Sequence, residues 1–338
     1  PSEQRRDPLA QDATHQDAIH RDATHQAPPD QLKDLPPDSG WDGLLEASPK
    51  AEKVNYHEVI SRLLAGEENA LLELQRGGAA AVGALMLAFP GPPLRSSNPR
   101  SSNPRSSAPL NENNPQELER PILKGLITMG SIATPFVTIR TADSDPNIRR
   151  LATLVLGELK GKDAARAIAR RIYDEDPHVC RAALESARRL FDHALSRQAF
   201  RAQLQEVIAD QAQEFDDRLA AIDALATIRE EKSIPTLLRQ LESPEGLLSS
   251  AALRALELLT AEDYGHDLDR WREFWQQHRD SPRKDWLFEA LGHATLKTRQ
   301  FAASELQFLG FDLGDYSADA PESTRSTALD AFLARQSQ

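Results

Sequence analysis

Basic side chains gather in the middle of the sequence, where they could bind a carboxylate or a phosphate. Residues 140–201 hold 13 basic and 9 acidic side chains, whereas the whole chain has 52 acidic and 40 basic residues. Arg166 and Arg170 are four residues apart and share one face of a helix, and guanidinium groups bind anions in paired hydrogen bonds. Acidic neighbours such as Asp174 favour the alternative of a solvated, charge-paired surface. The candidate binding residues are Arg149, Arg150, Arg166, Arg170, Arg171, Arg181 and Arg188.

Aromatic side chains form a second constellation near the C-terminal end. Trp271, Phe274, Trp275 and His278 follow the spacing i, i+3, i+4 and i+7, which places them on one helix face, and Trp286 comes shortly after. Such a row closes a hydrophobic core, or it lines a pocket for a peptide anchor or a flat ligand. His278 fits a partly exposed edge position, because no second histidine or cysteine stands at metal-binding spacing from it.

Nucleophilic and metal-binding chemistry has little support in this sequence. The single cysteine, Cys180, rules out an intrachain disulfide and a cysteine zinc site, and no histidine or Asn/Asp base is identifiable for it. Glycine-rich phosphate loops, Gly-x-Ser-x-Gly elbows and His-Glu-x-x-His pairs are absent. We therefore expect no metal, no cofactor and no enzymatic activity.

The elements that carry these residues repeat along the chain. The sequence DPNIR at 145–149 recurs 31 residues later as DPHVCR at 176–181, and Ser-Pro pairs stand at 243–244 and 281–282. Asp or Ser before Pro predicts a helix start, because the side chain caps free backbone N–H groups and Pro fits the first helical turn. Equal chemistry at four starts predicts one unit copied several times.

The pattern within each copy predicts a pair of amphipathic helices. Apolar residues recur at helical spacing after each start, and Gly161 separates the two helices of the clearest pair. The template fits seven segments, the first two loosely: 56–89, 116–142, 145–172, 176–210, 214–242, 247–279 and 283–313. We predict an all-α solenoid of about six to seven helix pairs, in which neighbouring pairs bury each other's apolar faces.

The Asp-Pro starts, the short helix pairs and small residues such as Gly130 and Gly157 resemble HEAT repeats of the short bacterial kind. This resemblance covers about residues 56–316 and implies a right-handed α-α superhelix of the HEAT or armadillo type. Blocks such as FPGP at 89–92 and YGHDLDRWREFW at 264–275 also resemble myxobacterial-type HEAT proteins without assigned chemistry. HEAT-like relatives include bilin lyases and di-iron hydroxylases, but the hydroxylases need several His-Glu pairs and this chain has one, His57-Glu58.

Composition divides the chain into three parts. Residues 1–50 are rich in Pro, Asp and Gln and poor in apolar residues, which predicts a disordered low-complexity segment. Residues 51–316 form the solenoid, interrupted at 90–115 by a disordered loop rich in Pro, Ser, Asn and Arg. Residues 317–338 form a C-terminal tail that could contain a short helix.

Charge and composition narrow the partners. The net charge of -12 disfavours nucleic acid and anionic membranes as partners, and no apolar run reaches the ~20 residues of a membrane-spanning helix. We expect a non-enzymatic scaffold that binds a protein or peptide of unknown identity. The alternatives are an accessory enzyme of the bilin-lyase kind and nucleic-acid binding through the central basic repeats. We expect a cytoplasmic location, which depends on what precedes Pro1, because the chain does not begin with Met.

Overall fold

The computed structural model describes residues 54–93 and 115–336, and all regular structure in these two ranges is helical. The predicted disordered segment 1–50 and most of the predicted loop 90–115 lie outside the described residues. No single helix in the described ranges is long and apolar enough to cross a membrane. One bent pair, Pro121–Thr128 with Gly130–Arg140, could do so by length and composition alone.

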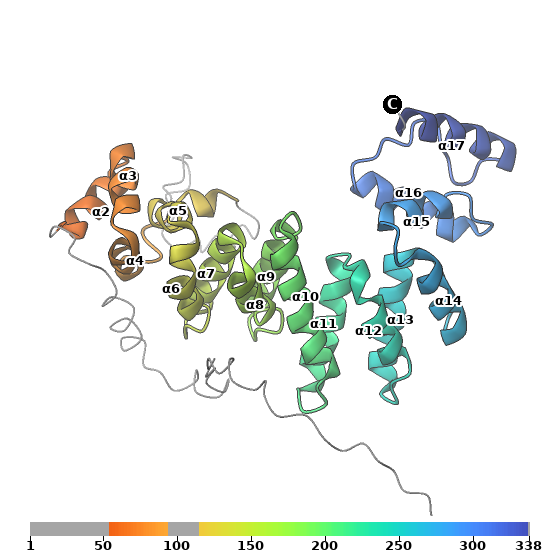
Figure 1. The fold of residues 1–338 in the computed structure, drawn as a ribbon, viewed down its shortest axis with the longest axis horizontal. Helices are drawn as coiled ribbons and strands as arrows, with labels where there is room; N and C mark the ends of the chain where they lie inside the picture. The colour runs from red at the N-terminus through yellow and green to blue at the C-terminus, as the bar shows by residue number, and fades with distance from the viewer. Residues whose placement is uncertain (1–53, 94–114, 337–338) are drawn as a thin grey trace, which may run out of the picture. The chain divides into compact units, whose positions relative to one another are not determined.

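The helices follow one another in pairs after a three-helix N-terminal unit (Figure 1). This unit contains α2 (Tyr56–Leu64), α3 (Glu68–Arg76) and α4 (Gly78–Leu87). The six pairs of residues 115–336 are α5 (Pro121–Thr128) with α6 (Thr134–Arg140), α7 (Pro146–Leu159) with α8 (Lys162–Ala169), α9 (Pro177–Arg189) with α10 (Ala194–Ala209), α11 (Phe215–Thr227) with α12 (Ile234–Leu241), α13 (Gly246–Thr260) with α14 (Leu268–His278), and α15 (Arg283–Ala290) with α16 (Leu296–Phe308). Short 3-10 helices η2 (Pro115–Glu119), η3 (Gly130–Ala133) and η4 (Glu231–Ser233) lie between them, and α17 (Glu322–Gln336) follows.

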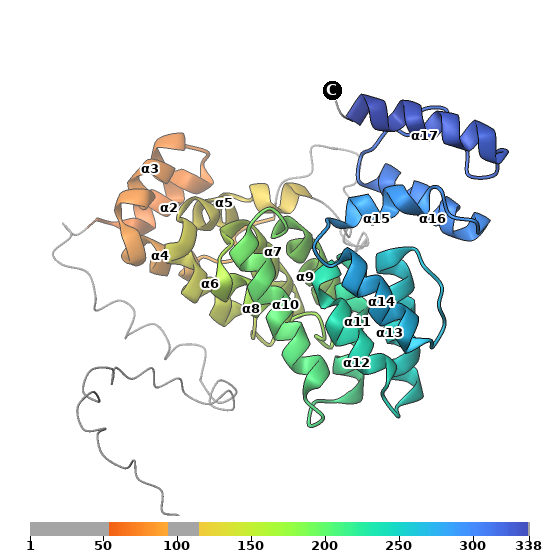
Figure 2. The same ribbon diagram turned by 45° about the vertical axis from the view of Figure 1, so that its right-hand side comes forward.

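Successive pairs stack in two layers. Helix α7 packs against α9, and α11 packs against α13. The second helices form the other layer, in which α8 contacts α6 and α10, and α12 contacts α10 and α14. Figures 1 and 2 both show α7 beside α9 and α8 beside α10. The predicted all-α solenoid is thus confirmed, and its first unit holds three helices in place of two.

Two of the four expected helix starts behave as predicted. The Asp145 carboxylate accepts a hydrogen bond from Asn147 N at 2.8 Å, and Asp176 caps His178 N at the same distance. Each carboxylate is followed by Pro at the first helical position. These caps fix where α7 and α9 begin.

The Ser-Pro starts differ because their hydroxyls are used elsewhere. Ser243 Oγ accepts from Glu245 N in the turn before α13, which begins only at Gly246. Ser281 Oγ accepts from Trp286 Nε1 at 2.8 Å and donates to the carbonyl of His278. Neither serine caps its helix.

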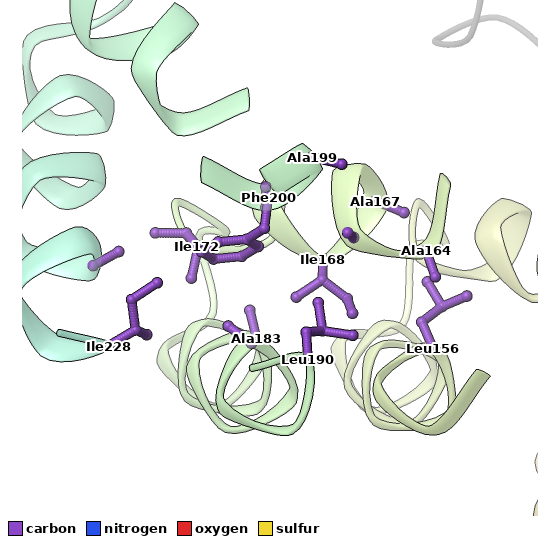
Figure 3. Packing of buried hydrophobic residues seen from close by; sticks show 14 of the residues in the cluster. Leu156, Ala164, Ala167, Ile168, Ile172, Ala183, Leu190, Ala199, Phe200 and Ile228 are labelled. Atoms are coloured by element: carbon purple, nitrogen blue, oxygen red, sulfur yellow. The ribbon is translucent and has the colours of Figure 1, made fainter. Parts of the chain in front are cut away.

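A continuous apolar core lies between the layers. In Figure 3, Leu156 and Leu190 from the α7 and α9 layer face Ile168 and Phe200 from the α8 and α10 layer. Leu156 and Ile168 are fully buried, and each such side chain contributes about 2 kcal/mol by its removal from water.

The first-helix layer is packed closely where small residues meet. A Cβ atom built on Gly157 of α7 would lie 2.8 Å from the Cβ of Ser186 on α9. Ser186 Oγ in turn donates to the carbonyl of Thr153 at 3.0 Å. A glycine at 157 is therefore required by the approach of α7 and α9.

A second, separate core closes the C-terminal end. It contains Leu287, Leu291, Leu306 and Phe332, whereas the neighbouring Trp286 belongs to the main core. Phe332 lies on α17 within the region expected to form a tail, and its ring packs edge-on against Phe288 at 5.3 Å. Helix α17 supplies the last fully buried side chain of the stack.

Candidate protein-interaction surface

Arg149 lies inside the fold, in contrast to its predicted role at a binding surface. Its side chain is only 6% exposed and donates hydrogen bonds to both carboxylate oxygens of Asp174, from Nε to Oδ2 at 3.0 Å and from Nη2 to Oδ1 at 2.7 Å. Nη1 donates to the carbonyls of Asp143 and Ser144. Burial opposes ionisation of Asp174, but the hydrogen bonds from Arg149 outweigh it and hold the pKa of this carboxyl below its usual range.

Cys180 occupies the same place one repeat later. Its thiol donates to the carbonyl of Asp174, with Sγ to O at 3.0 Å. Burial raises the pKa of the thiol, which favours the neutral form. The geometry agrees with a simple structural thiol.

The same position carries a donor in three more helices. Arg149 and Cys180 are each the fourth residue of their helix, and so are Arg218, Ser249 and Arg299. Ser249 Oγ donates to Leu241 O at 2.8 Å, and Arg299 Nη1 donates to His293 O at 2.8 Å. Each donor ties its helix to the chain just before it by satisfying main-chain carbonyls. Arg149, Cys180 and Arg299 bond loop carbonyls, whereas Ser249 and Arg218 bond carbonyls in the last turn of the preceding helix. Arg218 and Arg299 are not among the residues predicted from the sequence, although their fixed position as the fourth residue of a helix is a signal that could identify them.

Arg150 and Arg171 are also committed to the fold. Arg150 Nη1 lies 2.6 Å from Glu117 Oε2, and Arg171 Nη1 donates to Thr141 O at 2.9 Å and pairs with Asp174 at 3.1 Å. Burial lowers the pKa of Arg171. Like Arg149, each of them pairs with an acidic residue of the fold, in contrast to the surface position expected from the sequence.

Two further buried carboxylates, which the sequence did not identify as candidates, join distant parts of the stack. Glu230 is fully buried and pairs with Arg197 at 2.7 Å and Arg201 at 3.0 Å. Glu305 pairs with Arg229 at 2.8 Å and Arg283 at 2.9 Å. These clusters hold repeats together, and their partners lie 22 to 76 residues apart in the chain.

The remaining arginines are exposed, but they lie on opposite layers. Arg166 and Arg170 lie at α8, and Arg181 and Arg188 lie on α9. Figure 3 shows α8 and α9 on the two sides of the shared core, so their exposed faces point away from each other. The candidate binding residues that stay exposed therefore lie on two separate surfaces.

The α8 surface carries a row of three cations, Lys162, Arg166 and Arg170, which we call the α8 basic row. These residues are spaced i, i+4 and i+8, and all three are exposed. Arg166 Nη1 lies 3.1 Å from Asp163, whose side chain is 83% exposed. An ion pair this exposed contributes little and can exchange for another carboxylate. The side chains of Lys162 and Arg170 make no hydrogen bond or ion pair within the described part of the chain.

Apolar side chains border the α8 basic row at both ends. Gly161 N donates to Ser196 Oγ at 2.8 Å, which sets the start of α8 beside the start of α10 and its exposed Leu195. Arg171 Nη1 bonds Thr141 O, which sets the end of α8 beside the end of α6 and its exposed Ile139. The surface thus runs from an aliphatic residue through three cations to a second aliphatic residue.

The aromatic cluster belongs to the interior. Trp271, Phe274 and Trp286 are buried, and Trp275 is partly buried. Trp271 Nε1 donates to Gly265 O at 2.8 Å, and the rings of Phe274 and Trp286 meet edge to face at 5.7 Å. The indole N–H groups of Trp271 and Trp286 are both hydrogen-bonded within the fold, so these side chains form part of the core and do not line an open pocket.

The described residues contain no cluster of metal-ligating side chains. No three His, Cys, Asp or Glu residues within 54–93 and 115–336 lie close enough together to hold an ion. His57 and Glu58 are exposed on α2.

Comparison with known proteins identifies no family for this chain. No family model matches the sequence, and no curated protein matches it. Among solved structures, an engineered protein is similar over 76% of this chain and 97% of its own, at 10% identity and a TM-score of 0.28. The complex of CpcE and CpcF of phycocyanin lyase from Nostoc sp. PCC7120 is similar over 86% of this chain and 91% of its own, at 19% identity and a TM-score of 0.27.

Proposed function

We propose that this chain is a HEAT-type scaffold that binds an acidic segment of a protein partner through the α8 basic row. The observation that supports this proposal is the exposure of Lys162, Arg166 and Arg170 on one side of one helix. Other arginines of the central repeats, such as Arg149, Arg150 and Arg171, pair with carboxylates inside the fold. The three side chains of the α8 basic row remain available to a ligand, and the one ion pair among them, between Arg166 and Asp163, is exposed.

The charge of the whole molecule favours a compact acidic ligand. A chain with a net charge of -12 repels a long polyanion, so three cations cannot supply the many phosphate contacts that nucleic-acid binding relies on. A short carboxylate-bearing segment needs only the local row, and guanidinium groups bind carboxylates well in paired hydrogen bonds. The proposed partner is therefore a protein.

The test is titration of a fluorescent Glu-rich peptide into the whole protein, followed by anisotropy at several salt concentrations. We expect binding that weakens as salt rises. The double variant Arg166→Glu with Arg170→Glu should lose it. A matched control, Arg76→Glu with Lys284→Glu, makes the same change in net charge at exposed positions on α3 and α15 and should bind as the wild type does.

Two results would overturn the proposal. One is equal binding by the α8 variant and the wild type while both melt at the same temperature. The other is tighter binding of a single-stranded oligonucleotide than of the acidic peptide at near-physiological salt, which would make nucleic acid the ligand.

A further inference from the structure

The surface around α8 restricts the order of residues in its ligand. The α8 basic row extends over eight residue steps, from Lys162 to Arg170, or about 12 Å at 1.5 Å per step. Leu195 borders it at the Lys162 end and is 51% exposed, and Ile139 borders it at the Arg170 end and is 37% exposed.

Two hydrogen bonds between helices set this order. The bond from Gly161 N to Ser196 Oγ joins the residues next to Lys162 and Leu195. The bond from Arg171 Nη1 to Thr141 O joins the residue after Arg170 to a residue two positions beyond Ile139. Because α8 packs against both α6 and α10, the exposed faces of these three helices form one surface.

Close to the α8 basic row, the apolar ends lie on faces with few charges. On α6, Pro135 is exposed one turn before Ile139. On α10, Leu195 is followed along the exposed face by Gln198 and Ala202, and the first charged side chain of that face is Glu206, three turns from Leu195. Exposed aliphatic side chains beside a row of cations gain from contact with apolar groups of a ligand whose charges the row attracts.

We infer that the ligand is a protein segment in which two aliphatic residues bracket a run of carboxylates. This inference rests on the function proposed above and adds to it the order of chemical groups in the partner. The carboxylates meet Lys162, Arg166 and Arg170, the Asp163 contact of Arg166 exchanges for one of them, and the aliphatic residues contact Leu195 and Ile139.

The inference is tested with peptides of equal composition. One set carries a leucine on each side of a run of four or of ten Glu and Asp residues, which covers extended and helical binding over about 12 Å. In the permuted set both leucines stand together at one end. We expect at least one bracketed peptide to bind the whole protein about tenfold more tightly than its permuted partner.

Variants of the protein separate this inference from the function on which it rests. Replacing Leu195 and Ile139 together by Gln should remove the preference for the bracketed peptide and leave salt-sensitive binding of the permuted one. Leu247→Gln is the control, since Leu247 is 67% exposed on α13, away from this surface, and its loss should change neither. Equal affinity for bracketed and permuted peptides would overturn the inference while the proposed function stands. Failure of every acidic peptide to bind would overturn both.

Discussion

Arg229 and Glu305 lie 76 residues apart in the chain and meet in a two-armed ion pair, with Nε and Nη2 each 2.8 Å from a carboxylate oxygen. Arg283 completes the cluster at 2.9 Å from Glu305 and also donates to the carbonyl of Leu259. The turn after α11 is thereby joined to α15 and α16, where the main core gives way to the second one.

Removing the charge of Glu305 should destabilise the protein markedly. Glu305→Gln leaves the buried Arg283 without its counter-ion, and breaking a buried pair in this way costs about 3 kcal/mol. Urea unfolding measures the change. Glu242→Gln is the control: Glu242 pairs with Arg272 at an exposed site, so its loss should cost about 0.5 kcal/mol or less. Equal losses for the two variants would contradict a structural role for the cluster.

Acid should weaken the same contacts. Burial opposes the charge of Glu305, but the hydrogen bond from Arg229 and the nearby charge of Arg283 lower its pKa. Burial also opposes the charge of Asp174, and the hydrogen bond from Arg149 likewise lowers the pKa of that carboxyl. Stability from a carboxyl with a lowered pKa is fully present above its unfolded value of about 4 and is lost as pH falls through the folded value. We therefore expect the unfolding free energies of the wild type and Glu305→Gln to converge as pH falls below about 4. A gap that stays constant with pH would refute this account.

Adding one methyl group at Gly157 should separate α7 from α9. The new Cβ would lie 2.8 Å from Ser186 Cβ, and overpacking of this kind costs about 1 to 3 kcal/mol. Gly246→Ala serves as the control, because no atom lies within 4 Å of that Cβ and alanine favours the helix. Calorimetric melting should show a lower Tm for Gly157→Ala, partly restored by adding Ser186→Gly. No difference between the two alanine variants would contradict the close packing.

Cys180 should react slowly with alkylating agents. Burial raises the pKa of its thiol and the thiol donates to Asp174 O, so little thiolate is available near neutral pH. Iodoacetamide labelling followed by mass spectrometry should proceed about tenfold or more slowly in the folded protein than in 8 M urea, an estimate from the rarity of thiolate alone. Labelling at the same rate in both states would show that the thiol is open and ionised.

Loss of the Phe332 ring should affect the C-terminal core first. Phe332 is fully buried, and truncation of a buried Phe to Ala costs about 3 to 5 kcal/mol. Because Trp286 belongs to the other core, Phe332→Ala should make residues after Leu287 protease-sensitive before tryptophan fluorescence changes. Simultaneous loss of both signals would mean that the two cores unfold as one.

Much of the architecture could be predicted from local chemistry. Asp145 and Asp176 cap their helices because a carboxylate needs only the next two or three backbone N–H groups, all close in sequence. The burial of Trp271 and Phe274 follows in the same way from their spacing along one helix.

Local chemistry could not predict which arginines are paired inside the fold and which remain exposed. Arg149 finds its carboxylate 25 residues later, and Arg150 finds Glu117 33 residues earlier, so only the stacked helices bring them together. Arg166 and Arg170 stay exposed because their faces point out of the layer, and sequence spacing does not tell which carboxylates reach them.

The contact of Arg149 with Asp174 also bears on how such a chain grows. Both residues fall inside one 31-residue period, from Asp145 to the residue before Asp176. The other bonds of Arg149 go to Glu175, which lies in the same period, and to two main-chain oxygens that any amino acid provides. A gene segment encoding that period can be duplicated or deleted together with this ion pair. Array length can therefore change during evolution without leaving Arg149 or Asp174 unpaired in the interior.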